Sequence, residues 1–141
     1  MKSEPAALGT HLLLELKDCS IDTLKDLKKI KEILIKAAQI SKATIIETAF
    51  HNFSPFGVSG MIIIAESHLA IHSYPEYGYA SVDIFTCGNL IDPKIASEYI
   101  IKEFESKNPE TVVIRRGILS PNENGKLPHK IFQGELCQNL N

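Results

Sequence analysis

Apolar and polar residues alternate over most of this chain, and clusters of turn-forming residues separate the alternating runs. Alternation over several residues is typical of a half-buried strand, whereas an apolar residue every three to four positions indicates a helix. On this basis we expect strands over 9–17, 43–53, 60–67, 69–74, 79–86 and 111–117. Two helices are expected, one over 22–39 and one from 93 to about 106.

Helix-starting residues support these boundaries. Ser20 or Asp22 can cap the first helix, and Asp92 followed by Pro93 is a favourable start for the second. SPFGVSG (54–60) and PEYG (75–78) are rich in turn-forming residues. The apolar stripe of the first helix consists of Leu24, Leu27, Ile30, Leu34 and Ala38.

The resulting order is β-α-β-β-β-β-α-β. Neighbouring strands in the middle of the chain favour hairpins, and hence a mostly antiparallel sheet with two helices on one face. We therefore expect an α/β (α+β) sandwich formed by a single domain, residues 1–141. Residues 118–141 show no periodicity and are interpreted as a tail.

The strand over 79–87 has two different faces. Ala80, Val82 and Ile84 share one face, which suits a core beneath helices. The other face is half polar, and consists of Ser81, Asp83, Phe85 and Cys87. Such a face is either in contact with water or covered by a partner that requires polar groups there.

Composition narrows the class of protein. The 141 residues are 44% hydrophobic, enough for a core, and a net charge of −2 indicates no general attraction to nucleic acid or to anionic membranes. No apolar run approaches the ~20 residues that a bilayer requires, and the first ten residues lack the features of a secretory signal. Cys19, Cys87 and Cys137 form no CxxC motif. We expect a reduced, cytoplasmic protein.

His68 and His72 are four residues apart, which suggests a metal site if they lie on a helix. On a strand they share a face but lie ~13 Å apart at ~3.3 Å per residue, so one zinc ion cannot bind both. No metal is expected. A serine hydrolase is not favoured either, because Ser67 lies in A-E-S-H-L rather than in a G-x-S-x-G turn. Taken alone, Cys87 is equally well a buried free thiol.

The stretch ESHLAIHSYPEYGYASVDIFTCG (66–88) holds these residues in one arrangement. It resembles the activation and active-site segment of the S-adenosylmethionine decarboxylase proenzymes, in particular the short prokaryotic pyruvoyl-dependent family. The similarity extends through FSPFGVSGMIIIAESH (53–68) and includes LGTHLLLEL near the start and IRRG near the end. It covers about residues 8–117.

The resemblance implies a proenzyme that cleaves its own Glu66–Ser67 bond. The Ser67 hydroxyl attacks the preceding carbonyl, the resulting ester loses its carboxylate by β-elimination, and the dehydroalanine hydrolyses to a pyruvoyl group and ammonia. The products are a β chain, 1–66, and an α chain, 67–141. By position, His72 assists the elimination and Ser59 assists the rearrangement.

Decarboxylation requires an electron sink, which cofactors usually supply. The eight glycines form neither G-x-G-x-x-G nor a Walker loop for a phosphate-bearing cofactor. A pyruvoyl group made from Ser67 is a covalent sink, since it forms a Schiff base with the substrate amine. The resemblance assigns the later proton donation to Cys87.

The resemblance also implies the substrate-binding residues. Phe53 stacks on adenine, Glu76 accepts hydrogen bonds from the ribose, and Tyr74 is an aromatic platform where many relatives carry tryptophan. The product is S-adenosylmethioninamine, the aminopropyl donor for spermidine biosynthesis. The sequence is equally compatible with plain packing of Phe53 and Tyr74 and with a solvated Glu76.

The family forms homodimers, in which two protomers build a four-layer αββα assembly with active sites where the sheets meet. This explains the half-polar face of 79–87 as both interface and active-site wall. No nucleic acid or membrane partner is expected.

Two alternatives stay open. One is a pyruvoyl-dependent decarboxylase of another amino acid, such as arginine or ornithine, because the activation residues act before any substrate arrives. The other is a non-catalytic dimer that binds a nucleoside and never cleaves. Carbon dioxide release from the three substrates distinguishes the first, and the mass of the intact chain distinguishes the second.

Overall fold

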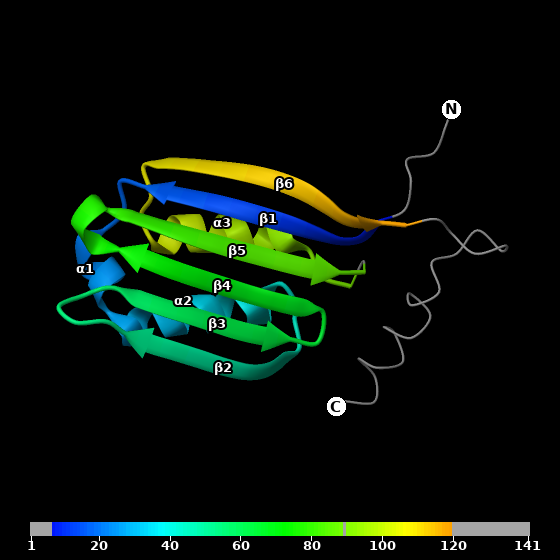
Figure 1. Cartoon of the computed structure of the whole chain (residues 1–141), viewed down its shortest axis with the longest axis horizontal. Helices are drawn as coiled ribbons and strands as arrows, with labels where there is room; N and C mark the ends of the chain where they lie inside the picture. The colour runs from blue at the N-terminus through cyan, green and yellow to red at the C-terminus, as the bar shows by residue number, and fades with distance from the viewer. Residues whose placement is uncertain (1–6, 89, 120–141) are drawn as a thin grey trace, which may run out of the picture.

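The computed structural model describes residues 7–88 and 90–119. They form one six-stranded sheet in the order β2-β3-β4-β5-β1-β6, and the helices lie on one side of it (Figure 1). All neighbouring strands are antiparallel, which confirms the predicted fold class. The strands are β1 Ala7–Lys17, β2 Ile45–Asn52, β3 Val58–Ile64, β4 Ser67–Tyr74, β5 Tyr79–Cys87 and β6 Asn108–Ile118. The helices are α1 Ile21–Lys25, α2 Leu27–Ile40 and α3 Pro93–Glu103, with a 3-10 turn, η1, at Pro75–Tyr77.

The first predicted helix, 22–39, is in fact two helices. Asp26 has an extended backbone and its side chain accepts a hydrogen bond from the Lys29 N–H at 3.1 Å. Asp26 therefore ends α1 and caps α2, because a short carboxylate satisfies a free N–H at a helix start better than it fits a helix interior. The expectation of two helices is wrong on this point. Ser20 is the cap of α1.

The strand boundaries also differ from the prediction. β3 starts at Val58, within the predicted turn 54–60, and Ser67 is the first residue of β4 rather than the end of the preceding strand. The turn between them lies at residues 65–66, and Ile64 pairs with Ser67. The all-apolar run at 61–64 carries no alternation that could mark its end. The last strand reaches Ile118, and the rest of the predicted tail, 120–141, lies outside the described residues.

The core lies between the sheet and the helices. Alternate residues of each central strand point into it, as predicted for Ala80, Val82 and Ile84, each at most 1% exposed. Helices α2 and α3 cover these side chains with a matching apolar face. Their buried residues include Ile30, Leu34, Ala37, Ala38, Ala96 and Ile100. Within the described residues, no helix is long and apolar enough to span a bilayer.

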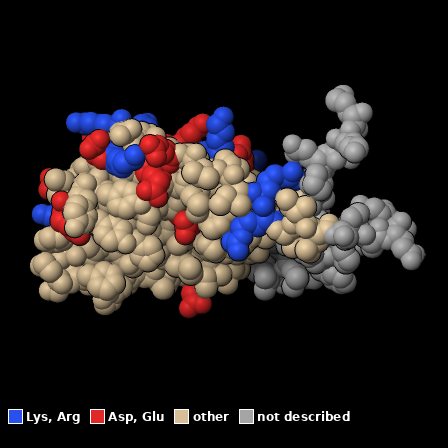
Figure 2. All heavy atoms as spheres, turned by 45° about the horizontal axis from the view of Figure 1, so that its top comes forward, with Lys and Arg blue, Asp and Glu red and all other residues tan. Residues whose placement is uncertain are grey.

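The opposite face of the sheet, here called the open face, carries no helix of the described chain (Figure 1). Large apolar side chains on it remain 40–50% exposed, namely Met61, Ile63, Val112 and Ile114. Figure 2 shows the charged side chains gathered mainly in the upper part of that view, with few of them below. An exposed apolar sheet face of this kind marks an interaction surface.

A buried serine joins the sheet to α1. The Ser73 hydroxyl donates to the Leu24 carbonyl at 2.8 Å and accepts from the Val58 N–H at 2.9 Å. One side chain thereby satisfies a carbonyl at the end of a helix and an N–H at the start of β3.

We predict that Ser73→Ala lowers the free energy of unfolding by about 1–3 kcal/mol, because two buried backbone groups lose their partner. Urea unfolding of the uncleaved Ser67→Ala background measures this. Ser59→Ala in the same background is the matched control, since its hydroxyl lies on the exposed side of the sheet and should contribute about 0.5 kcal/mol or less. Equal effects of the two substitutions would contradict the prediction.

Candidate active site

The Glu66–Ser67 bond lies at a tight turn between β3 and β4. Ser67 has a φ of +149°, a region that residues with a side chain rarely occupy. Backbone conformations of this kind cost on the order of 1–3 kcal/mol and occur mainly at functional sites. The strained residue is thus the serine that the sequence predicts at the cleaved bond.

The carbonyl of Glu66 is held from the neighbouring strand. It accepts a hydrogen bond from the Cys87 N–H at 2.8 Å. The Glu66 side chain is buried, and one of its carboxylate oxygens accepts from the Thr44 N–H at 3.3 Å. The bond is therefore fixed on its Glu66 side, and an N–H donor points at the oxygen that would become negative during attack by Ser67.

Cys87 ends β5 on the open face, as the pleat of 79–87 predicts, and it is a free, partly buried thiol. Opposite it on β1 lies Gly9. A Cβ at Gly9 would lie 3.2 Å from the Cys87 Sγ and 2.7 Å from the ring of Phe85. A side chain at position 9 would therefore clash with the Phe85 ring and the Thr86 carbonyl, so the close approach of β1 to β5 beside the thiol requires glycine.

Ser59 and His72 form a second group. They are directly paired across β3 and β4, and the Ser59 Oγ lies 2.7 Å from the His72 Nδ1. Antiparallel register places both on the open face, so the sheet itself brings together the two residues that the sequence predicts to assist processing.

The three predicted substrate-binding residues line one hollow beside this pair. We call it the aromatic hollow; it encloses about 300 Å³ and is lined by Phe53, Phe56, Gly57, Ser59, His72, Ser73, Tyr74 and Glu76. Phe56 was missed from the sequence, although it lies in the same turn as Phe53. A ring that is 39% exposed in this position is available for contact with a ligand.

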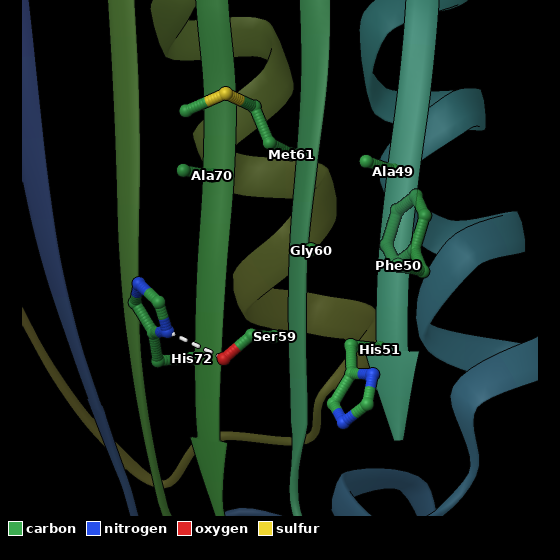
Figure 3. Close-up of a pocket in the computed structure, with 8 residues that line it drawn as sticks. All are labelled: Ala49, Phe50, His51, Ser59, Gly60, Met61, Ala70 and His72. Atoms are coloured by element: carbon green, nitrogen blue, oxygen red, sulfur yellow. Dashed lines mark hydrogen bonds between the residues drawn. The ribbon is translucent and has the colours of Figure 1, made fainter. Parts of the chain in front are cut away.

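A second hollow adjoins the same pair on the open face. It is lined by Ala49, Phe50, His51, Ser59, Gly60, Met61, Ala70 and His72. Figure 3 shows Ser59 between His72 and His51, with the small side chains of Ala49 and Ala70 further along the strands. Ser59 and His72 therefore lie on the border of two hollows.

The two groups are far apart within one protomer. Ser67 and His72 are five residues apart on β4, which corresponds to about 16 Å at ~3.3 Å per residue. The structure thus brings Ser67 together with Cys87, and brings Ser59 and His72 together with Phe53, Tyr74 and Glu76. Within one protomer, Ser67 and Cys87 remain apart from Ser59 and His72.

Comparisons with known proteins address the family. The model of the S-adenosylmethionine decarboxylase family matches residues 10–117. An S-adenosylmethionine decarboxylase proenzyme from Thermodesulfovibrio yellowstonii is 58% identical over 130 residues, which cover 92% of this chain and 96% of the relative. The chain belongs to the S-adenosylmethionine decarboxylase family.

Further similarities agree with this family. A proenzyme of the same name from Moorella thermoacetica is 49% identical over 115 residues, which cover 82% of this chain and 92% of the relative. The crystal structure of the adenosylmethionine decarboxylase from Aquifex aeolicus matches with a TM-score of 0.76 at 34% identity, over 80% of this chain and 93% of that one. The family and fold expected from the resemblance are confirmed; the roles of individual site residues stay predictions.

This member of the S-adenosylmethionine decarboxylase family also has a cluster of charged groups that the sequence analysis missed. His11 and His68 flank Phe85 from the two neighbouring strands. The Arg116 guanidinium lies over the Phe85 ring and donates to the His11 Nδ1 at 3.2 Å. The alternation of 9–17 could have placed His11 on the open face.

The cluster contains a set of possible metal ligands, because ligand atoms of His11, His68 and Asp83 lie within 4.8 Å of one another. Arginine only donates hydrogen bonds, so the His11 Nδ1 accepts and a neutral imidazole carries its proton on Nε2. Nε2 is the atom that faces Asp83, at 3.9 Å. The positive Arg116 guanidinium next to His11 opposes a second cation at this position, so the geometry favours a network of charges.

Burial lowers the pKa of His68, and the neighbouring His11 and Arg116 act in the same direction, while Asp83 opposes them. The unfolded chain therefore binds a proton at a higher pH than the folded chain does, and stability falls as the pH drops below the unfolded value of ~6.5.

We predict that the free energy of unfolding of the Ser67→Ala protein decreases between pH 7.5 and 5.5, and decreases less when His68→Gln is added. Urea unfolding at several pH values measures both slopes. If the free energy of unfolding depended on pH equally in the single and the double variant, groups other than His68 would be responsible for the pH dependence.

Proposed function

We propose that this chain is the proenzyme of a pyruvoyl-dependent S-adenosylmethionine decarboxylase, which forms S-adenosylmethioninamine for spermidine biosynthesis. The observation that carries the proposal is the strained Ser67 directly after a carbonyl held by the Cys87 N–H, in a chain that is 58% identical to a proenzyme of this name. The single domain 1–141 would become two chains, 1–66 and 67–141.

Cleavage follows from the groups at the turn. Attack of the Ser67 hydroxyl on the Glu66 carbonyl carbon places negative charge on the carbonyl oxygen, which the Cys87 N–H stabilises. The attack breaks the amide and forms an ester. Loss of the Ser67 α-proton then expels the Glu66 carboxylate, and hydrolysis releases ammonia. Breaking the chain here also releases the strain at Ser67.

The site suits a pyruvoyl group at position 67. That group supplies an electrophilic carbonyl that accepts the electrons released with carbon dioxide. The Cys87 thiol is only partly buried, and Cys87 and Ser67 lie at the same end of β5 and β4. We propose that Cys87 returns the proton to the α-carbon of the substrate.

The aromatic hollow suits a nucleoside better than a small amino acid. Three aromatic rings and the Glu76 carboxylate line about 300 Å³, and a carboxylate can accept hydrogen bonds from both ribose hydroxyls. Arginine and ornithine offer no flat ring for these side chains. We therefore propose that Phe53 stacks on adenine, that Tyr74 forms a second wall, and that Glu76 binds the ribose.

A homodimer would complete the site. We propose that the open faces of two copies meet, so that Ser67 and Cys87 of one copy face Ser59 and His72 of the other. A two-fold axis that joins Ser67 to His72 in both directions crosses β4 midway, next to Ala70. The small side chain there and the exposed apolar residues around it suit close contact between two sheets.

The absence of a metal and the cytoplasmic location stay predictions. The charge network around Arg116 supports the first.

We predict that the freshly purified wild-type protein gives two chains by intact mass, 1–66 and 67–141, with a carbonyl at the new amino end that reacts with a hydrazine reagent. Ser67→Ala should give one chain and no carbonyl. Purified wild-type protein should release carbon dioxide from S-adenosylmethionine rather than from arginine or ornithine. A single unreacted chain in the folded wild type would refute the proposed function.

We further predict that processing occurs between copies. His72→Ala and Ser67→Ala homodimers should each stay uncleaved. When the two variants are produced together with different tags, the His72→Ala chain should be cleaved, because its Ser67 faces an intact His72 of the other copy. Mass analysis of both tagged chains measures this, and no cleavage in the mixed dimer would exclude the composite site.

A further inference from the structure

Each of the three aromatic rings in the aromatic hollow contacts a second group that does not line it. The ring of Phe53 contacts His51, the ring of Tyr74 contacts Tyr79, and the ammonium of Lys25 lies 5.5 Å from the centre of the Phe56 ring. The three rings are 39–50% exposed, so these contacts help to fix the orientation in which each ring faces the hollow.

His51 supports Phe53 from the end of β2. The two ring centres are 4.5 Å apart at an angle of 72°, an edge-to-face arrangement. His51 is also the register partner of Ser59, and Figure 3 shows it beside Ser59 on the side away from His72. It is therefore next to both the ring of Phe53 and Ser59.

Tyr79 supports Tyr74 from β5. The two residues are register partners, and their rings are stacked with centres 5.6 Å apart at 23°. The Tyr79 hydroxyl donates to a carboxylate oxygen of Glu15 on β1 at 2.6 Å. Burial and this carboxylate raise the pKa of Tyr79 to about 12, so the hydroxyl keeps its proton.

We propose that His51 and Tyr79 are positioning residues that hold the walls of the aromatic hollow in the geometry that binds a purine nucleoside. The inference rests on the proposed function, in which Phe53 and Tyr74 contact the nucleoside. Neither His51 nor Tyr79 touches the reacting atoms; each lowers the cost of ordering a wall when the nucleoside enters.

The first test separates ring contact from other roles of His51. His51→Ala should raise the KM for S-adenosylmethionine about two- to twelve-fold, the factor that corresponds to about 0.5–1.5 kcal/mol for one ring pair, with kcat within about twofold. His51→Phe retains a ring and should restore KM. The proposal would be overturned if His51→Ala had the same KM as the wild type. It would also be overturned if His51→Ala and His51→Phe raised KM to the same extent.

The second test uses Tyr79 in the same way. Tyr79→Leu should raise KM to a similar degree. Tyr79→Phe keeps the ring but loses the hydrogen bond to Glu15, so its KM should lie between those of Tyr79→Leu and the wild type. Tyr99→Leu on α3 is the matched control, since this tyrosine lies in the helix layer. An effect of Tyr99→Leu as large as that of Tyr79→Leu would indicate general destabilisation and overturn the proposal.

A binding measurement makes the test independent of catalysis. The chain contains no tryptophan, so Tyr74→Trp introduces a single indole into the hollow. Titration with 5′-methylthioadenosine, an unreactive nucleoside thioether, should change its fluorescence, and adding Tyr79→Leu should raise the Kd about two- to twelve-fold and increase quenching by acrylamide.

The outcomes are separable from those of the proposed function. Self-cleavage precedes substrate binding, so all these variants should still give the two chains 1–66 and 67–141. Failure of the wild type to cleave would refute the proposed function, whereas cleavage and decarboxylation with an unchanged Kd in the Tyr79→Leu variant would overturn only the positioning roles.

Discussion

The hydrogen bond from the Cys87 N–H to the Glu66 carbonyl joins the end of β5 to the turn that precedes β4. This contact sets the pairing of Ser67 with Thr86, and the antiparallel ladder then carries the same register to the far ends of both strands. There it places Tyr74 opposite Tyr79. Because side chains alternate between the faces, a slip of one residue would turn His68 and His72 into the core. The strained backbone at Ser67, the position of the Cys87 thiol and the aromatic walls thus depend on one register.

The same register separates the site into two parts. A straight strand cannot bring Ser67 to His72, because the five residue steps between them span about 16 Å. A larger protein could solve this with a loop that folds back. Here no helix of residues 7–88 and 90–119 covers the open face, which exposes apolar side chains, and a symmetric pair of such faces would complete two sites at once.

The cluster around Phe85 differs from the two hollows because it consists mainly of charged and polar side chains. Arg116 donates to His11, whose other ring nitrogen faces Asp83, and burial keeps the pKa of His68 low. These groups lie next to the turn, on the same side of the sheet as Cys87. They add polar groups to an otherwise largely apolar surface, which limits how a second sheet can pack against it.

The amino-acid sequence was enough to predict the number of strands, the faces of 79–87 and the family, because alternation and a specific motif are local properties of the chain. It did not determine that Asp26 divides the first helix or that the turn lies at 65–66, since capping competes with helix continuation and an all-apolar run has no internal boundary. Which distant residues meet depends on the folded sheet. His51 contacts Phe53 within one segment, but Cys87 reaches the Glu66 carbonyl and Tyr79 reaches Tyr74 through pairing between strands. Register is a property of the whole sheet that no single segment encodes.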